Sequence, residues 1–147
     1  IMLIGEGPGQ QEDLSGVPFV GPAGKLLDKM LASVNLDRKD VYIANIVKCR
    51  PPGNRDPHED EQEACMNYLR YQLTLVKPKI IVCLGRVAAT AIIDKNFKIT
   101  KEHGEWVERK GYWITATYHP SALLRDETKK RPAWEDLKAI RAKLDEL

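Results

Sequence analysis

Three short apolar runs rich in β-branched residues constrain the fold more than any other feature of this sequence. They span residues 1–4, 41–47 and 79–84. Runs that are apolar on both faces are typical of strands buried inside a parallel sheet. Helical periodicity separates them, and the expected helices cover about 23–34, 58–75, 86–93 and 132–147. Because parallel strands need long crossover connections, this order predicts an α/β fold.

A hairpin is expected to complete the sheet. Residues 105–109 and 112–118 flank Lys110-Gly111, and the second of these two arms should join the parallel strands. We therefore expect a three-layer α/β/α sandwich with a central, mainly parallel four-stranded sheet. The chain has 147 residues, 43% of them hydrophobic, which suits a single domain over 1–147. Because the chain opens on an apolar strand and not on Met, we expect that the domain lacks an N-terminal segment.

Composition excludes some classes of protein. A formal net charge of +2 is too small for a dedicated nucleic-acid binder, so any DNA contact must be local. We see no apolar stretch of membrane-spanning length and no signal peptide, so a cytoplasmic protein is the default. Three cysteines disfavour a disulfide framework. Cys83 lies inside an apolar run and is expected to be a buried small hydrophobe.

A long glycine-rich loop over residues 5–21 follows the first strand. It fits a dinucleotide-phosphate loop poorly, because its glycines are spaced G-x-G-x-G, Pro8 removes a donor, and two acids beginning at Glu12 would repel a pyrophosphate. Loops 48–57 and 119–125 also follow expected strands. In an open parallel sheet, the carboxyl ends of the strands meet at the edge where ligands bind. The sequence therefore predicts a binding site built from these three loops.

Several polar residues near this edge allow two interpretations each. Asn45 ends an apolar strand, either as a hydrogen-bonded structural amide or as a reader of a base, since its amide matches O4 and N3–H of uracil but not cytosine. His119 and Ser121, taken alone, are as expected of a strand end and a helix start. Cys49 and Cys65 flank a very polar segment and supply only two of the ligands that a metal site needs.

Five stretches, in this order along the chain, together closely resemble the family-4 uracil-DNA glycosylases, the iron-sulfur members of the uracil-DNA glycosylase superfamily. They are G-E-G-P-G-Q-Q-E-D, G-V-P-F-V-G-P-A-G-K-L-L-D, N-I-V-K-C-R-P-P-G-N-R-D-P, K-P-K-I-I-V-C-L-G and H-P-S-A-L-L-R. The resemblance implies hydrolysis of the N-glycosidic bond of uracil in flipped nucleotides of DNA, which initiates base excision repair, without a nucleotide cofactor. It implies uracil-containing DNA as the partner. We also expect a monomer, which suits a base-flipping enzyme, a nucleoid-associated location, a replication clamp as a further partner and no membrane.

The resemblance assigns roles to residues of the predicted site. Phe19 is the aromatic plate for uracil, Asn45 binds its Watson-Crick edge, and His119 donates to the anion that develops on O2. Leu123 is the apolar wedge that fills the gap left by the flipped base. The remaining residues implied to line the base pocket are Gly5, Pro8 and Gly9, and those implied to contact DNA are Ser121 and Arg125.

The residue that activates water is not assigned by the resemblance. Gly7 stands where the best-known branch of the superfamily carries an aspartate. Glu6, Glu12 and Asn54 are the polar candidates for positioning water nearby. The glycosidic bond can break largely by dissociation to an oxocarbenium-like sugar, so a strong base is not required.

Cys49 and Cys65 correspond to the second pair of ligands of a structural [4Fe-4S] cluster in the family, whose first pair lies in a C-x-x-C element before the first strand. Two other functions stay open from the sequence. One is a catalytically weak DNA-binding or replication-associated module that retains the base pocket, because Gly7 replaces the aspartate. The other is a generic nucleotide-binding α/β domain, which the poor phosphate loop disfavours.

Overall fold

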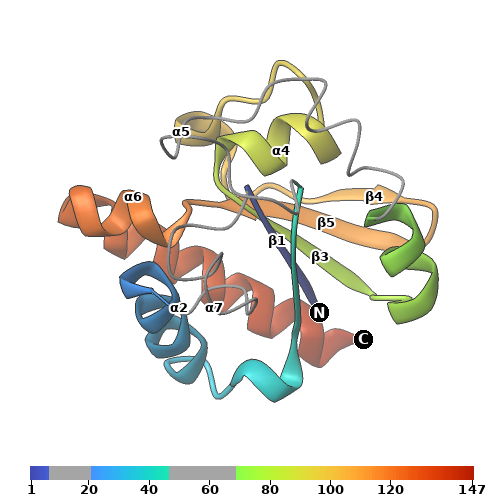
Figure 1. Ribbon diagram of the computed structural model, residues 1–147, viewed down its shortest axis with the longest axis horizontal. Coiled ribbons are helices and arrows are strands. Elements are labelled where there is room, and N and C mark those ends of the chain that lie inside the picture. Colours follow the sequence, from blue (N-terminus) through green and yellow to red (C-terminus); the bar gives the residue numbers. More distant parts are fainter. Residues whose placement is uncertain (7–20, 47–68) are drawn as a thin grey trace.

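The computed structural model describes residues 1–6, 21–46 and 69–147, and over these ranges the chain forms a single mixed sheet of five strands (Figure 1). The strand order is β2-β1-β3-β5-β4. The strands are β1 (Met2–Gly5), β2 (Tyr42–Asn45), β3 (Ile80–Leu84), β4 (Val107–Arg109) and β5 (Tyr112–Thr117). All neighbouring pairs are parallel except β4 with β5. The predicted α/β fold is thus confirmed.

The predicted four-stranded sheet is wrong by one strand. The hairpin forms where it was expected, and its second arm, β5, joins the sheet beside β3. However, its first arm, β4, also pairs with β5, through Val107↔Ile114, Glu108↔Trp113 and Arg109↔Tyr112. These backbone bonds make β4 a fifth strand at one edge of the sheet.

Helices connect the strands. They are α2 (Pro22–Ala32), α4 (Arg86–Ile92), α5 (Ile99–Glu102), α6 (Pro120–Arg125) and α7 (Lys130–Glu146), with 3-10 turns η1 (Arg38–Asp40) and η3 (Glu127–Lys129). The helices expected at 23–34, 86–93 and 132–147 are confirmed, with bounds shifted by at most two residues. The helix expected at 58–75 lies partly outside the described residues, and residues 69–76 of that region are helical.

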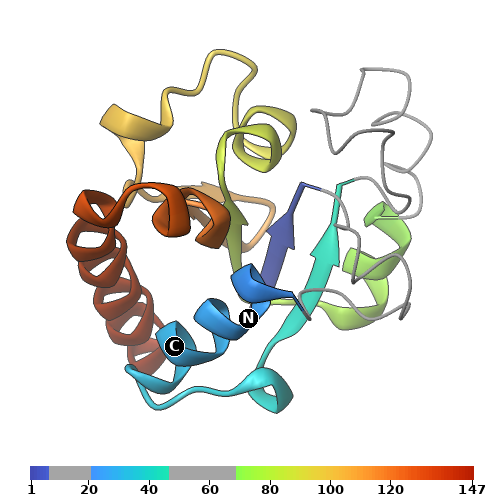
Figure 2. The same ribbon diagram turned by 60° about the vertical axis from the view of Figure 1, so that its left-hand side comes forward.

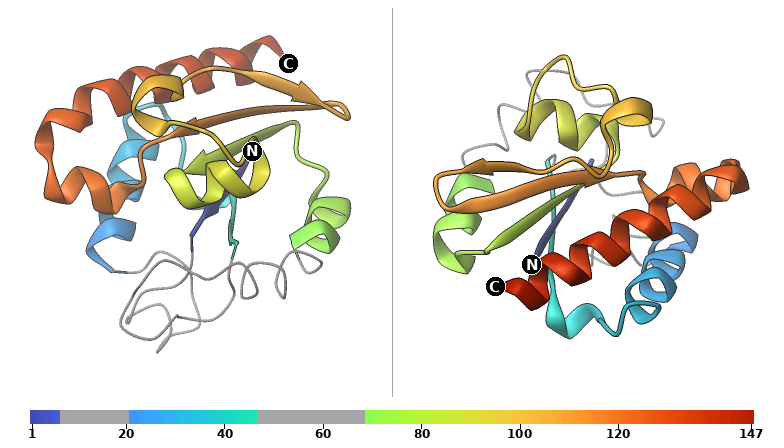
Figure 3. Two further views of the ribbon diagram at one scale, coloured as in Figure 1. Left: turned by 90° about the horizontal axis from the view of Figure 1, so that it is seen from above. Right: turned by 180° about the vertical axis from the view of Figure 1, so that it is seen from behind.

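The buried side chains form two large clusters on opposite faces of the sheet. Alternation along β3 sends Ile81 and Cys83 to the first cluster and Ile80, Val82 and Leu84 to the second. The first includes residues of α4, and the second includes residues of α2 and α7. Figure 3 shows α4 and α7 on opposite sides of the strands. Because both faces are covered, the central strands can be apolar along their whole length.

Two tryptophans of the hairpin region hold the C-terminal half of α7. The Nζ atom of Lys143 lies 4.1 Å from the ring centroid of Trp113 and 5.2 Å from that of Trp106. At such distances the ammonium group is attracted by the electron-rich ring faces. These contacts dock α7 beside β5.

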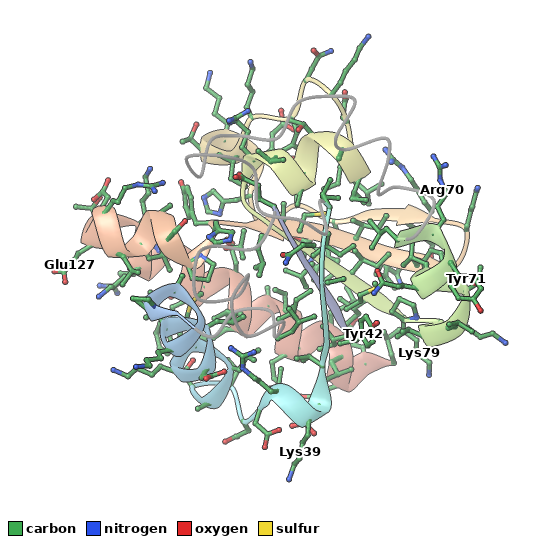
Figure 4. All side chains as sticks on the ribbon, viewed as in Figure 1. Lys39, Tyr42, Arg70, Tyr71, Lys79 and Glu127 are labelled. Carbon is green, nitrogen blue, oxygen red and sulfur yellow. The ribbon has the colours of Figure 1, made fainter. Side chains whose placement is uncertain are left out.

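The helical segment 69–76 lies at the end of the molecule opposite α6 (Figure 1). Gln72 donates from Nε2 to the hydroxyl of Tyr42 over 2.9 Å, which joins this segment to the start of β2. Figure 4 shows Tyr71 on that side, whereas Glu127 of η3 lies at the opposite end, beside α6. The features described below belong to the α6 end of the molecule and the adjoining edge of the sheet.

The carboxyl ends of β1, β2, β3 and β5 lie along one edge of the sheet, as their parallel pairing requires. Figure 2 shows β1 and β2 pointing toward this edge. The chain passes from β1 to β2 on one side of β1, and β3 lies on the other side. This reversal makes the end of β1 a topological switch point, where open α/β sheets bind ligands.

Candidate active site

Four described segments meet at this edge. Asn45 ends β2 opposite Gly5, the last residue of β1. The N–H of Gly85, directly after β3, donates to the carbonyl of Thr117 at the end of β5 over 2.8 Å. His119 follows two residues later. The structure therefore places Gly5, Asn45 and His119 along the same edge of the sheet, as the sequence predicted.

His119 has a defined tautomer. It caps α6, and its Nδ1 accepts the backbone N–H of Ser121 over 3.0 Å. The hydroxyl oxygen of Ser121 lies 2.8 Å from the same nitrogen. Since a backbone N–H can only donate, Nδ1 carries no proton, and the proton of the neutral ring is on Nε2. His119 is thus a neutral N–H donor.

Gly85 makes room for His119. Its φ is +92°, a conformation that side chains rarely adopt, and a Cβ at this position would lie 2.9 Å from Cβ of His119. The sharp turn after β3 and the position of the histidine therefore both require glycine here.

Asn45 is only 8% exposed, and its Oδ1 is buried. Its neighbours Ala44 and Ile46 belong to the cluster on the α4 side. By the alternation of a strand, the side chain of Asn45 faces the α2 and α7 side. The predicted position at the strand end is confirmed, whereas the choice between base reader and structural amide stays a prediction.

The sequence-family model of the Uracil DNA glycosylase superfamily matches residues 1–138 of this chain. The chain belongs to this superfamily. It is 49% identical to the type-4 uracil-DNA glycosylase of Archaeoglobus fulgidus over 148 residues, which cover 95% of this chain and 74% of that protein. The type-4 enzyme of Sulfurisphaera tokodaii is 47% identical, with 96% of this chain and 68% of the relative covered. That of Thermotoga maritima is 43% identical, with 97% and 76% covered.

In this superfamily member, the three residues implied to contact DNA lie on α6. The backbone N–H of Ser121 donates to Nδ1 of His119, and Arg125 is exposed near the end of the helix. Leu123, implied to be the apolar wedge, is 1% exposed and packs in a cluster with Tyr118 and Ala133, and its role as a wedge stays a prediction. The neighbouring Leu124 is 49% exposed. As described, α6 therefore presents Leu124 and not Leu123 to solvent, because its inward face is covered by α2 and α7.

The other predicted residues of this glycosylase-superfamily site divide by location. Gly5 is buried at the end of β1, and Glu6 follows it, half-buried, at the switch point. The predicted site residues that lie outside the described residues are Gly7, Pro8, Gly9, Glu12, Phe19, Cys49, Asn54 and Cys65. Within the described ranges, no three His, Cys, Asp or Glu side chains are grouped as a metal site. In the same ranges, no helix is both long and apolar enough to cross a membrane.

Cys83 is fully buried in the first cluster, which confirms the expectation of a small hydrophobe. Burial raises the pKa of its thiol to about 12, and the positive charge of Arg109 lowers it by a smaller amount. A thiol that keeps its proton is a poor nucleophile and metal ligand. Cys83 is therefore suited to packing in the core and not to nucleophilic chemistry or metal binding.

Sequence reasoning missed two features of this site. Gly85 had a signal, a glycine directly after an apolar strand and before a helix, which commonly marks a close approach of backbone. Asp136 of α7 is buried and contacts Thr117 near His119. Its signal was an acid on the apolar face of a helix, three residues after Ala133 and four before Ile140.

Proposed function

We propose that this chain is a type-4 uracil-DNA glycosylase that hydrolyses the N-glycosidic bond of uracil in DNA and so starts base excision repair. The observation that carries the mechanism is the neutral His119 held by Ser121 at the carboxyl edge of the sheet. When the bond breaks, negative charge develops on O2 of uracil. An Nε2–H donor directed at that oxygen would lower the barrier, as an oxyanion hole does. No nucleotide cofactor is needed.

Asn45 and His119 are proposed to bind opposite sides of the base. Asn45 ends β2 and His119 follows β5. These two strands are three strand spacings apart, about 14 Å between backbones. With the side chains of Asn45 and His119 extending toward each other, this distance would leave room for one pyrimidine between them. The amide of Asn45 would donate to O4 and accept from N3–H, which selects uracil over cytosine. Phe19 would stack on the ring, and Gly5, Pro8 and Gly9 would line the pocket.

Glu6 is the candidate among the described residues for orienting the attacking water. It follows β1, and the strand order places it between Asn45 and Gly85. Gly7, Glu12 and Asn54 are the other residues proposed for this region. Because uracil leaves and the sugar that remains in the DNA is oxocarbenium-like, a group that only orients water is sufficient.

Helix α6 is proposed to contact the DNA beside the flipped nucleotide. The exposed guanidinium of Arg125 suits a phosphate, and Ser121 lies at the start of the same helix. The gap in the duplex needs an apolar side chain. Leu123 fills it only if α6 moves, whereas Leu124 already faces solvent.

We further propose a [4Fe-4S] cluster with Cys49 and Cys65 as two ligands and with the other two before residue 1. Bound there, the cluster would be structural and would fix the loop 48–57. We also propose that the domain is a three-layer α/β/α sandwich, which the two core clusters on opposite sheet faces support. A monomeric state, a nucleoid location and a replication clamp as partner complete the proposal.

The test is alkali-induced cleavage of an oligonucleotide with a single uracil, after incubation with this chain or with a version extended at its N-terminus. Cleavage by either protein, and none with a thymine-containing control, is the expected result. If neither protein cleaves while both bind the uracil oligonucleotide, the glycosylase proposal fails and a binding module takes its place.

A further inference from the structure

Asp136 is a buried charged residue outside the proposed catalytic groups. It belongs to α7 and is only 7% exposed. Burying a carboxylate is costly unless hydrogen bonds compensate for the lost water. The partners of Asp136 therefore show what the carboxylate is for.

Two side chains donate to the same oxygen of Asp136. Thr117 Oγ1 donates to Oδ2 over 2.6 Å, and the Nδ1–H of His103 donates to Oδ2 over 2.7 Å. The other oxygen, Oδ1, faces the backbone of Gly104, where an added Cβ would lie only 2.5 Å away. Asp136 thus joins α7 to two other parts of the chain, the end of β5 and residues 103–104.

These contacts hold the two residues that precede His119. Thr117 is the last residue of β5, and its hydroxyl is fixed by Asp136. The ring of Tyr118 lies 4.9 Å from that of His103, centroid to centroid, and Nζ of Lys129 lies 5.4 Å from the Tyr118 centroid. The backbone is held as well, because the N–H of Gly104 donates to the carbonyl of Ala116.

We propose that Asp136, acting through Thr117 and His103, is a positioning residue for His119 in uracil excision, an inference that rests on the proposed glycosylase function. The network fixes the end of β5 from the α7 side, and Gly85 limits His119 from the β3 side. A displacement of about 1 Å in a reacting group can lower a rate by about a hundredfold, so small shifts of this strand end matter.

Two threonines on the same strand allow a matched test. Thr115 and Thr117 are both buried on the same face of β5, and each donates one hydroxyl bond. Thr115 donates to the carbonyl of Glu105 and does not contact Asp136. Replacement of either by Val keeps the shape and removes one buried hydrogen bond. Only Thr117→Val releases the anchor of the strand end.

We would measure single-turnover excision of uracil, affinity for the same DNA, and melting temperature for both variants. We expect Thr117→Val to lower the excision rate by at least about tenfold, with Thr115→Val within about twofold of wild type and both affinities unchanged. Equal excision rates in two folded variants would overturn the proposal, because Asp136 would then only stabilise the fold.

A double variant tests whether the network acts as a unit. Asp136→Asn removes the charge at nearly constant size. If Thr117 acts through Asp136, the double variant Thr117→Val/Asp136→Asn is no slower than Asp136→Asn alone. Fully additive rate losses would contradict the proposal. Should Asp136→Asn fail to fold, the threonine pair still decides.

The proposal can also be separated from the proposed activity. The ¹⁵N NMR signals of the His119 ring report its tautomer and surroundings without any turnover. We expect Thr117→Val to shift them and Thr115→Val to leave them in place. If the wild type does not excise uracil, the glycosylase function fails, while these signals still confirm or overturn the positioning role.

Discussion

Gly85 and His119 meet so closely that a single added carbon at Gly85 would lie 2.9 Å from Cβ of the histidine. The two residues follow neighbouring parallel strands, and the N–H of Gly85 is bonded to the strand that carries His119. The histidine therefore has a fixed position over the end of β3. That position is available only because residue 85 is a glycine and has no side chain.

Gly85→Ala is expected to lower the single-turnover rate of uracil excision by about a hundredfold, since His119 must move away from the new methyl group. The matched control is Gly111→Ala in the β4–β5 turn. Gly111 has a similar φ of +84°, but no atom lies within 4 Å of its added Cβ. Gly111→Ala should lose about 1–2 kcal/mol of stability from backbone strain. Gly85→Ala should lose more, because φ +92° with ψ 175° is a conformation that almost only glycine adopts, and because the new methyl group meets His119. Equal excision rates in the two variants would show that the contact with His119 is unimportant.

His119→Ala is expected to raise the barrier to excision by about 2–4 kcal/mol, the range found when one oxyanion donor is removed. Ser121→Ala removes the hydroxyl but keeps the backbone N–H that donates to Nδ1. The tautomer of the His119 ring should therefore persist in Ser121→Ala, and the loss of excision rate should be smaller than that of His119→Ala. Single-turnover excision measures both, and a wild-type rate for His119→Ala would exclude the donor role.

Asn45→Asp is expected to weaken discrimination between uracil and cytosine, because a carboxylate cannot donate to O4. The measurement is the ratio of excision rates on matched oligonucleotides that contain one or the other base. Asn45 is nearly buried, so the melting temperature must be followed in parallel. A variant that excises uracil as fast as wild type would remove Asn45 from the base pocket.

Leu123→Ala should mainly lower stability, whereas Leu124→Ala should mainly lower excision from duplex DNA. Leu123 is buried, and its truncation should lower the free energy of unfolding by about 2–5 kcal/mol. Leu124 is half exposed, so its truncation should leave stability nearly unchanged and reduce excision from duplex DNA more than from single strands. If excision from duplex DNA is unchanged in Leu124→Ala, α6 must move to present Leu123.

Cys83 should make stability fall at alkaline pH. The folded thiol has a pKa of about 12, whereas the ordinary value is 9.0, so between these values the unfolded chain loses a proton that the folded chain keeps. The stabilisation is complete below pH 9 and is lost as pH rises toward 12, by at most about 4 kcal/mol. Urea titrations at pH 8 and pH 10.5 measure the loss. Cys83→Ala should show a shallower decline, and identical declines would contradict the raised pKa.

The sequence predicted the features that depend on neighbouring residues in the chain. The apolar runs at 1–4 and 79–84 and the Lys110-Gly111 turn specified their elements locally, and parallel pairing then brought Asn45 and His119 to one edge. The β4–β5 hairpin was predicted, but its first arm was not counted as a strand of the sheet, which gave four strands where the structure has five. Six residues of α6 are too few for periodicity to decide which leucine faces inward.

The role of Asp136 could not be predicted for a different reason. Its burial depends on Thr117 and His103, which lie 19 and 33 residues earlier in the chain. Helical spacing puts Asp136 on the apolar face of α7 with Ala133 and Ile140, unlike the exposed Glu135, but it does not show which distant side chains donate to the carboxylate.

The order of elements along α7 and the sheet has a consequence for biosynthesis. All five described strands precede α7, so every strand and His119 leave the ribosome before the carboxylate that anchors the end of β5. A nascent chain interrupted before Asp136 has the residues proposed for chemistry but lacks the acceptor of Thr117 and His103. If Asp136 positions His119 as proposed, maturation of the site waits for the last helix of the chain described by the structure.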